Sequence, residues 1–262
     1  MNNIKIGQWF SKEEAKNIYP NVTFLGKVWI GDNVEIESDV WIKDGVTTKG
    51  NIIIGDGVII GGTVEIGDDV TIGDNVEIGD NATIGNYVAL GAGVFIKTNV
   101  MIGYDIKIGN NVKIMSGITI GDNVEIGDDV MLGRNVEIGT GVTIKTNVEI
   151  GAGVTIKTNV MIGRNVTIGD DVTIGRNVEI EDDVMIGNNV KIMAGTTIGD
   201  GVIIGDDVMI GRNVKIGAGV TIKTNVKIED GVRIKANVMI EHNVTIGDNM
   251  TIKDTQRITK DM

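Results

Sequence analysis

Residues 120–139 read IGDNVEIGDDVMLGRNVEIG, and an aliphatic residue returns at every sixth position of this stretch. The same register holds over forty hexads, from position 24 to position 258, without an insertion. A second apolar position lies two residues before each of these, and it is Val in thirty-three hexads. The recurring residue of the first position is Ile except at Phe24, Thr48, Leu90 and Leu132. A fixed period of this length identifies a repeat protein.

Each hexad combines the pattern of a short strand with that of a sharp corner. Val76 and Ile78 lie two residues apart, so in an extended segment both point to one side while Glu77 points to the other. Gly79, Asp80 and Asn81 follow. The third corner position is Asn, Asp or Gly in nearly every hexad, and these residue types tolerate a left-handed backbone. A helix is disfavoured, because a six-residue period does not match 3.6 residues per turn and β-branched residues oppose it.

Short strands joined by identical corners must coil. Each hexad begins with an aliphatic residue followed by Gly, and a small aliphatic residue stands two places before the next hexad begins. This pattern resembles the hexapeptide-repeat family. The resemblance covers residues 22–258. It implies an all-β, left-handed parallel β-helix, a triangular solenoid with three hexads per coil and about 13 coils. The period alone shows neither the number of hexads per coil nor the handedness, and ordinary parallel crossovers are right-handed.

The ends of the chain differ from its middle. Ser11-Lys12-Glu13-Glu14 has the spacing of a capping box, and the stretch that follows stops at Pro20, so a short helix is expected there. We therefore expect an N-terminal cap at 1–20, one β-helix at 21–258 and a polar tail at 259–262. The aromatic residues around the helix predict a plug over the first coil, and Gln256 in the Val row predicts closure of the other end by polarity.

Composition excludes several classes of function. The net charge of −12 argues against nucleic acid, which requires clustered Lys and Arg. The absence of cysteine removes disulfides and thiolate metal ligands. No apolar run approaches the length of a membrane span and no signal-peptide core is present, so neither membrane partners nor a location outside the cytoplasm is expected.

His242 is the single histidine and the one candidate for acid–base chemistry. The family resemblance implies acyltransferases that use a His as general base, often with a projecting loop, or carbonic anhydrases with three His zinc ligands. This chain has no loop insertion and lacks the other histidines. His242 lies at the second position of a corner, so it is interpreted as a solvated residue, with a general base at a subunit interface as the alternative.

Two other patterns imitate binding motifs. Residues 91–98, 139–146, 151–158 and 217–224 resemble phosphate-binding loops, but Ile stands where the motif needs Gly before the Lys, and a strand follows instead of a helix. Acid pairs such as Asp128-Asp129 resemble calcium ladders. The column at 18-residue spacing breaks that ladder with residues of mixed charge: Thr146, Arg164, Asp182, Asp200 and Ala218. No metal or cofactor site is therefore predicted.

Outward strand positions predict one apolar face. Every eighteenth residue on this face tends to be large and apolar, and this face predicts lateral self-association. Glu77 and Lys113 interrupt the column and favour the alternative, that these are simply good strand residues. The apolar members are Trp41, Ile59, Phe95, Met131, Met185, Ile203 and Met239. Thr recurs on another face as in ice-binding solenoids, but Glu65, Met101 and Glu137 interrupt that array.

The regularity of the repeats leads to the functional prediction. Consistent signals in every hexad indicate a designed or consensus-idealised solenoid. We expect a structural scaffold that is not an enzyme and has no catalytic, cofactor-binding or metal residues. The alternative is a homotrimeric acyltransferase relative that acts on a CoA thioester and a sugar or nucleotide-sugar, with His242 as its base.

Overall fold

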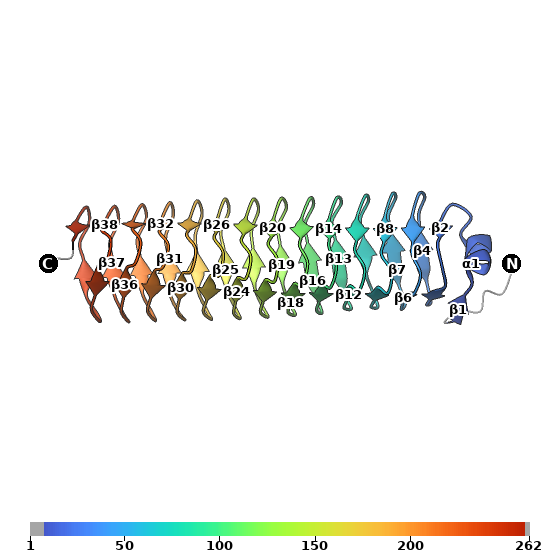
Figure 1. The fold of residues 1–262 in the computed structure, drawn as a ribbon, viewed down its shortest axis with the longest axis horizontal. Helices are drawn as coiled ribbons and strands as arrows, with labels where there is room; N and C mark the ends of the chain where they lie inside the picture. Colours follow the sequence, from blue (N-terminus) through green and yellow to red (C-terminus); the bar gives the residue numbers. More distant parts are fainter. Residues whose placement is uncertain (1–7, 260–262) are drawn as a thin grey trace. The chain divides into compact units, whose positions relative to one another are not determined.

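The computed structural model describes residues 8–259 and contains two compact units, Met1–Asp129 and Val130–Met262. Each unit is a parallel β-solenoid in which the chain passes through three sheets once per coil (Figure 1). The strands β2–β19 complete six coils in unit 1, and β20–β41 complete seven coils and one strand more in unit 2. The described chain is therefore nearly all-β, as predicted.

Three sheets make up unit 1. The first contains β1 (Gln8–Phe10), β3 (Val28–Ile30), β6 (Val46–Thr48), β9 (Glu65–Ile66), β12 (Thr83–Ile84), β15 (Met101–Ile102) and β18 (Thr119–Ile120). The second contains β4 (Val34–Ile36), β7 (Ile52–Ile54), β10 (Thr71–Ile72), β13 (Val88–Leu90), β16 (Ile106–Ile108) and β19 (Glu125–Ile126). The third contains β2 (Thr23–Phe24), β5 (Trp41–Ile42), β8 (Ile59–Ile60), β11 (Glu77–Ile78), β14 (Phe95–Ile96) and β17 (Lys113–Ile114).

Unit 2 repeats this arrangement. Its first sheet contains β21 (Glu137–Ile138), β24 (Thr155–Ile156), β27 (Thr173–Ile174), β30 (Lys191–Ile192), β33 (Met209–Ile210), β36 (Lys227–Ile228) and β39 (Thr245–Ile246). The second contains β22 (Thr143–Ile144), β25 (Met161–Ile162), β28 (Glu179–Ile180), β31 (Thr197–Ile198), β34 (Lys215–Ile216), β37 (Arg233–Ile234) and β40 (Thr251–Ile252). The third contains β20 (Met131–Leu132), β23 (Glu149–Ile150), β26 (Thr167–Ile168), β29 (Met185–Ile186), β32 (Ile203–Ile204), β35 (Thr221–Ile222), β38 (Met239–Ile240) and β41 (Arg257–Ile258).

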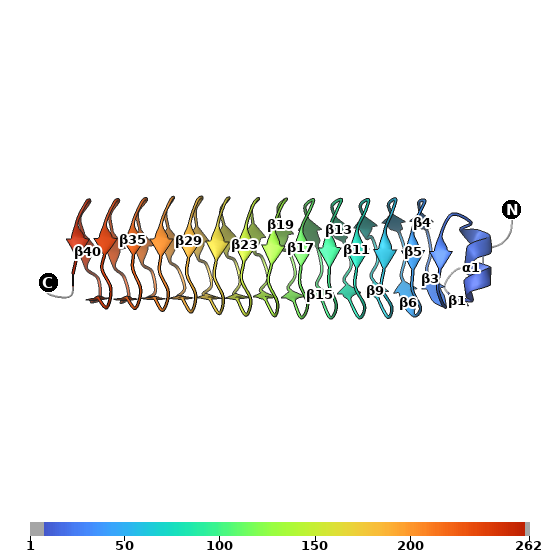
Figure 2. The ribbon, with the colours of Figure 1, turned by 45° about the horizontal axis from the view of Figure 1, so that its top comes forward.

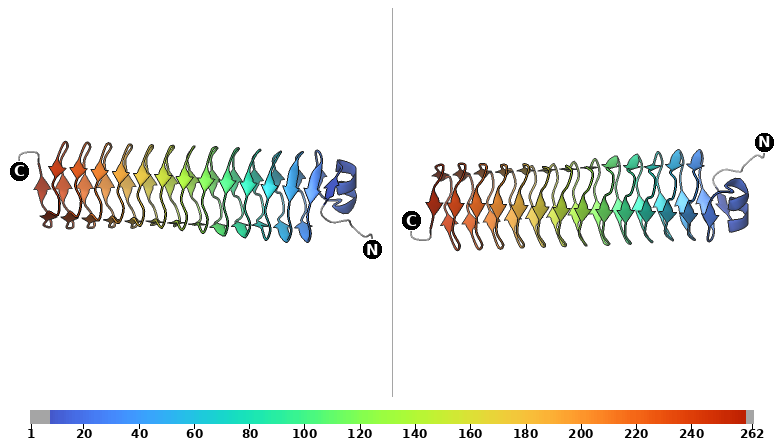
Figure 3. Two further views of the ribbon diagram at one scale, coloured as in Figure 1. Left: turned by 90° about the horizontal axis from the view of Figure 1, so that it is seen from below. Right: turned by 90° about the horizontal axis from the view of Figure 1, so that it is seen from above.

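The strand register confirms a coil of 18 residues. Glu77 of β11 pairs with Ile59 of β8 and with Phe95 of β14, both in parallel. Neighbouring strands of one sheet are thus three hexads apart in sequence, and they follow one another in rows (Figure 3). The left-handed winding that the family resemblance implies stays a prediction.

Left-handed residues make the corners. Asn147, at the third corner position, has a φ of 58°, and the equivalent residues of most other hexads share this conformation. Asn and Gly are the residue types best suited to it. The first corner position is usually Gly for a steric reason: a Cβ on Gly85 would lie 2.2 Å from the carbonyl oxygen of Gly103 in the next coil. Larger residues at this position require a displaced corner.

The Ile and Val rows fill the interior of each unit. Nearly all of these side chains are buried, while the residue between them on each strand faces outward. Two polar side chains share the core and bond to backbone carbonyls. Thr196 Oγ1 donates to the Gly211 carbonyl at 3.0 Å, and Thr48 Oγ1 donates to that of Trp29 at 3.2 Å. The polar atoms inside the core are therefore satisfied.

The predicted cap lies at the N-terminal end of unit 1, where helix α1 (Lys12–Ile18) sits against the first coil (Figure 2). Ser11 caps the helix: its Oγ accepts from the Glu14 N–H at 3.3 Å, and Glu14 Oε2 accepts from the Ser11 N–H at 2.8 Å. This second bond lowers the pKa of Glu14. Strand β1 pairs antiparallel with β3, so the cap also covers a strand edge.

The last coil of unit 2 contains an open cavity instead of a polar closure. Gln256 is exposed, and its Oε1 accepts from the Lys253 N–H at 3.0 Å. A cavity of about 430 Å³ remains beside it, lined by five polar residues, among them Gln256, and by five apolar ones: Val244, Ile246, Met250, Ile252 and Ile258. Gln256 therefore does not cover the core row as predicted. Residues 260–262 of the predicted polar tail lie outside the described residues.

No helix within residues 8–259 is long and apolar enough to cross a membrane.

Candidate functional site

His242 lies on an exposed corner that follows β38 in unit 2. Its Nδ1 is 2.7 Å from the Oγ1 of Thr224, which occupies the equivalent position one coil earlier. The neighbouring residues are also bonded, because Asn225 Nδ2 donates to Asn243 Oδ1 at 2.6 Å. When Nδ1 carries the proton and donates to Thr224, the other ring nitrogen, Nε2, is the one that can accept a proton.

A small charged cluster lies beside this histidine. Glu241 replaces the usual Gly of the corner and makes ion pairs with Lys223 Nζ at 2.8 Å and with Arg257 Nη2 at 2.6 Å. The Glu241 side chain is only 15% exposed. The hydrogen bond from Lys223, assisted by Arg257, holds the pKa of the Glu241 carboxyl below its ordinary value against the opposing effect of burial. Lys223 and Arg257 thus share one carboxylate, and Asp206 and Asp207 stand on the same corner one coil before Thr224 and Asn225.

The open cavity of the last coil adjoins this corner. Asn243, the residue after His242, is one of the residues that line it, and most of the others are apolar. A basic nitrogen, two cationic groups and a partly apolar cavity therefore lie at one end of unit 2. Chemically, this arrangement can accept a proton, attract a phosphate and accommodate a short hydrocarbon group.

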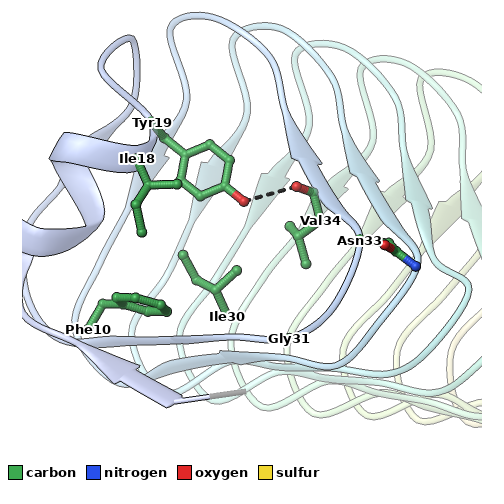
Figure 4. Close-up of a pocket in the computed structure, with 7 residues that line it drawn as sticks. All are labelled: Phe10, Ile18, Tyr19, Ile30, Gly31, Asn33 and Val34. Atoms are coloured by element: carbon green, nitrogen blue, oxygen red, sulfur yellow. Dashed lines mark hydrogen bonds between the residues drawn. The ribbon is translucent and has the colours of Figure 1, made fainter. Parts of the chain in front are cut away.

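A second cavity, of about 160 Å³, lies between the cap and the first coil of unit 1. The Tyr19 hydroxyl donates to the Val34 carbonyl at 2.9 Å (Figure 4). The cavity is also lined by the apolar side chains of Phe10, Ile18 and Ile30. Burial raises the pKa of Tyr19. The hydroxyl thus anchors the cap to the first coil.

Acidic side chains gather around a cleft of about 230 Å³ in unit 2. Glu181 stands at a corner position where Gly is usual, and burial, together with Asp200 and Glu179, raises its pKa. Asp182 is bound instead by Arg164, at 2.8 Å. No group of three or more possible ligands within residues 8–259 could hold a metal ion.

The segments that imitate phosphate-binding loops are ordinary hexads. The residues before the four lysines are buried, and each belongs to a strand: Ile96, Ile144, Ile156 and Ile222. Their backbones therefore run along the sheets and do not curl around a ligand.

Sequence reasoning missed the role of the second corner position. Asp128 Oδ1 accepts from the Asn110 N–H at 2.6 Å, and Asp182 Oδ1 accepts from that of Arg164 at 2.7 Å. The carboxylate of one coil thus satisfies a backbone donor of the coil before it. The signal was present, since Asp and Asn recur at this position, but the bond appears only once coils are stacked.

The predicted apolar face exists within each unit. In unit 1 the third sheet places Trp41, Ile59 and Phe95 on its outer surface, with Glu77 between the last two and Lys113 after them. Trp41 is 49% exposed and Ile59 is 41% exposed. In unit 2 the outward residues of the third sheet include four large apolar ones: Met131, Met185, Ile203 and Met239.

Comparison with known proteins adds a family match. The model described as bacterial transferase hexapeptide (six repeats) matches residues 63–98, 105–140, 123–158, 177–208 and 225–254, more than half of the chain. No match is found among curated proteins.

Several solved structures are similar to this chain. The UDP-N-acetylglucosamine acyltransferase from Arabidopsis is 17% identical, with 78% of this chain and 67% of that chain covered and a TM-score of 0.48. The enzyme of that name from Bacteroides fragilis is 23% identical, with 68% and 67% covered and a TM-score of 0.36. The O-acyltransferase from Moraxella catarrhalis is 20% identical, with 62% and 66% covered and a TM-score of 0.29. The chain thus spans about two thirds of their length.

These findings correct one prediction. The sequence predicts that the chain is not an enzyme, yet its repeats match a family described as bacterial transferase hexapeptide. The prediction rests on the regularity of the repeats, and that regularity does not outweigh a match to a transferase family over more than half of the chain.

Proposed function

Because the chain belongs to the bacterial transferase hexapeptide family, its repeats form that family's solenoid, and we propose that this solenoid acts as a rigid scaffold that binds a second copy of itself. The third sheet of unit 1 carries the proposal. Its outer surface is flat, lacks projecting loops, and presents Trp41, Ile59 and Phe95 in one register. Exposed apolar residues aligned in this way are typical of protein–protein contacts.

The charges on this sheet complement each other across a two-fold axis. Phe95 pairs with Glu77 on one side and with Lys113 on the other, so the acid and the base lie one coil away in opposite directions. A two-fold axis through Phe95 places Glu77 of one copy opposite Lys113 of the other, twice. An isologous contact requires this self-complementarity. Glu77 and Lys113 interrupt the apolar column and favour the alternative interpretation. In the proposed dimer they instead fix the register of one copy against the other.

Light scattering with a charge exchange tests the scaffold proposal. The parent chain is expected at twice its mass of 27.9 kDa. Lys113→Glu places like charges opposite each other and should give a monomer, whereas the double exchange Glu77→Lys with Lys113→Glu should restore the dimer. Lys107→Glu, on the second sheet, is the matched control and should leave the mass unchanged. A parent of single mass, or a double exchange that stays monomeric, would contradict the proposal.

One specific observation favours a second function that is compatible with the first. The contact of Thr224 Oγ1 with His242 Nδ1 orients the ring on the corner where Glu241 binds Lys223 and Arg257, and Asn243 of the same corner lines the cavity of the last coil. We therefore propose acyl transfer from a CoA thioester to a sugar or nucleotide-sugar, with His242 Nε2 as general base and the two cations attracting the phosphates of the donor.

Acetyl transfer to amino sugars tests this second function. His242→Ala should abolish turnover, and Thr224→Val should lower kcat because the ring loses its orientation. Thr146→Ala changes the same corner position elsewhere in unit 2 and should leave the rate unchanged. A parent without transferase activity, or a His242→Ala variant with full activity, would refute the role of His242.

A further inference from the structure

Two exposed tyrosines stand on one corner of unit 1. Tyr87 lies between β12 and β13, and Tyr104 lies between β15 and β16 one coil later. The two side chains are 52% and 49% exposed. Their ring centroids are 5.2 Å apart and the ring planes cross at 75°, so the edge of one ring points toward the face of the other. Both rings remain accessible to a ligand from solvent.

Tyr87 occupies a backbone conformation that suits it badly. Its φ is 58°, at the third position of the corner. Every other non-glycine residue with positive φ within residues 8–259 is Asn, Asp or Thr. A bulky residue in the left-handed region is an outlier, and such outliers cluster at functional sites.

A ladder of side-chain hydrogen bonds on this corner ends one coil before Tyr87. On this corner Asn33 Nδ2 donates to Asn51 Oδ1 at 3.1 Å, and Asn51 Nδ2 donates to Asp69 Oδ1 at 2.9 Å. Asp69 accepts but has no N–H to donate, so the ladder ends there, and Tyr87 is the next member of the column. An Asn at position 87 would fit the backbone and could start a new bond to the Asp105 carboxylate one coil later.

Tyr104 departs from the repeat in a second way. On this corner the Asp68 N–H donates to Asn86 Oδ1, and the Tyr104 N–H donates to Asp122 Oδ1, both at 2.9 Å. The Asn86 N–H would meet a carboxylate of the next coil if residue 104 were Asp. Tyr104 supplies a ring instead. Two neighbouring residues thus replace stabilising corner chemistry with exposed aromatic surface, which the fold itself does not require.

The charges around the pair define the class of ligand. Asp68 and Asp69 lie one coil before Tyr87, Asp105 follows Tyr104 directly, and Asp122 lies one coil after it. Aromatic faces attract cations through their quadrupole, and neighbouring carboxylates add to that attraction. We propose that Tyr87 and Tyr104 bind a quaternary ammonium group. The site lies on the corner of unit 1 between the first and second sheets, so it uses none of the residues of either proposed function.

Titration with tetramethylammonium chloride tests the site. The ring-proton resonances of Tyr87 and Tyr104 should shift saturably in NMR spectra of the full chain, with sodium chloride at equal ionic strength as the reference. Choline should give the same saturable shift, and its neutral isostere 3,3-dimethyl-1-butanol should give none. Asp105→Asn keeps a residue suited to positive φ and should weaken binding about threefold, as expected for one charge roughly 6 Å away in water.

Restoring the repeat residues separates a ligand site from a structural brace. Tyr87→Asn with Tyr104→Asp should raise the midpoint of thermal unfolding, because it relieves the backbone and gives the Asn86 N–H a carboxylate acceptor. It should also abolish the saturable shift followed through the neighbouring backbone amides. Tyr87→Phe with Tyr104→Phe should retain binding. The proposal is overturned if the parent does not bind, if it binds the neutral isostere equally well, or if the restored variant is less stable than the parent.

Discussion

Replacing Ile156 by alanine should strongly destabilise unit 2. Ile156 is 1% exposed, and its strand pairs on both sides, with Ile138 of β21 and Ile174 of β27. The change removes three carbon atoms from a packed layer. Their transfer from water contributes about 0.8 kcal/mol each. The cavity left behind adds to this, so the free energy of unfolding should fall by about 2–5 kcal/mol.

The matched comparison is Ile258→Ala in the last strand. Ile258 is half-buried, and its strand pairs on one side only, with Ile240 of β38. Fewer atoms surround it, and the end of a stacked array opens more easily than its middle. Its replacement should therefore lower the free energy of unfolding by less than about 1.5 kcal/mol.

Equilibrium urea denaturation of both variants, followed by circular dichroism, measures the two losses. The midpoint of Ile156→Ala should fall well below that of Ile258→Ala, with similar slopes. Equal losses at the two positions would refute the reasoning, because they would mean that stacking on both sides adds nothing to the stability of a buried Ile.

Three further outcomes follow from the cap and from the last coil. Deleting residues 1–20 should preserve the β-rich dichroism but produce assemblies that grow with concentration in light scattering, and an unchanged size would show that the segment covers nothing. Tyr19→Phe removes the bond to the Val34 carbonyl and should lower the free energy of unfolding by about 1 kcal/mol in thermal denaturation, whereas no loss would mean that the bond contributes nothing. The hydrogen bond from Lys223 depresses the pKa of Glu241 in the folded state. The carboxylate therefore stabilises the fold above the ordinary glutamate pKa, and this stabilisation is lost as the pH falls through the depressed value. Glu241→Gln should accordingly reduce the acid sensitivity of the last coils in hydrogen exchange, and an unaltered pH profile would contradict this.

Local patterns predict the coil because each hexad contains all the information that it needs. The spacing of Val76 and Ile78 places both in the core, and the third corner position carries residues suited to positive φ. The capping box at Ser11 likewise forms where its spacing indicates. Such features depend on neighbours in sequence, so they can be inferred before the chain is folded.

Contacts between coils are harder to infer. The bond between Thr224 and His242, and the ion pairs of Glu241, join residues about 18 positions apart and depend on the details of side-chain packing. A signal existed in the Glu that replaces Gly at position 241. The prediction from Gln256 is wrong: a polar residue in the core row was expected to cover the end of the solenoid, and it lies exposed instead. Family membership shows in the matched repeats and not in the number of histidines.

The coil of three hexads is the claim on which every other inference depends, and a pair of engineered cysteines tests it directly. The chain has no cysteine of its own. Thr155 and Thr173 are outward-facing partners on adjacent strands, and the spacing of about 4.8 Å between such strands lies within the range that a disulfide requires. Mild oxidation should therefore link Thr155→Cys with Thr173→Cys, detected as the loss of two free thiols. The matched pair Thr155→Cys with Thr167→Cys lies on different sheets and should stay reduced. A disulfide in the second pair and none in the first would contradict the coil.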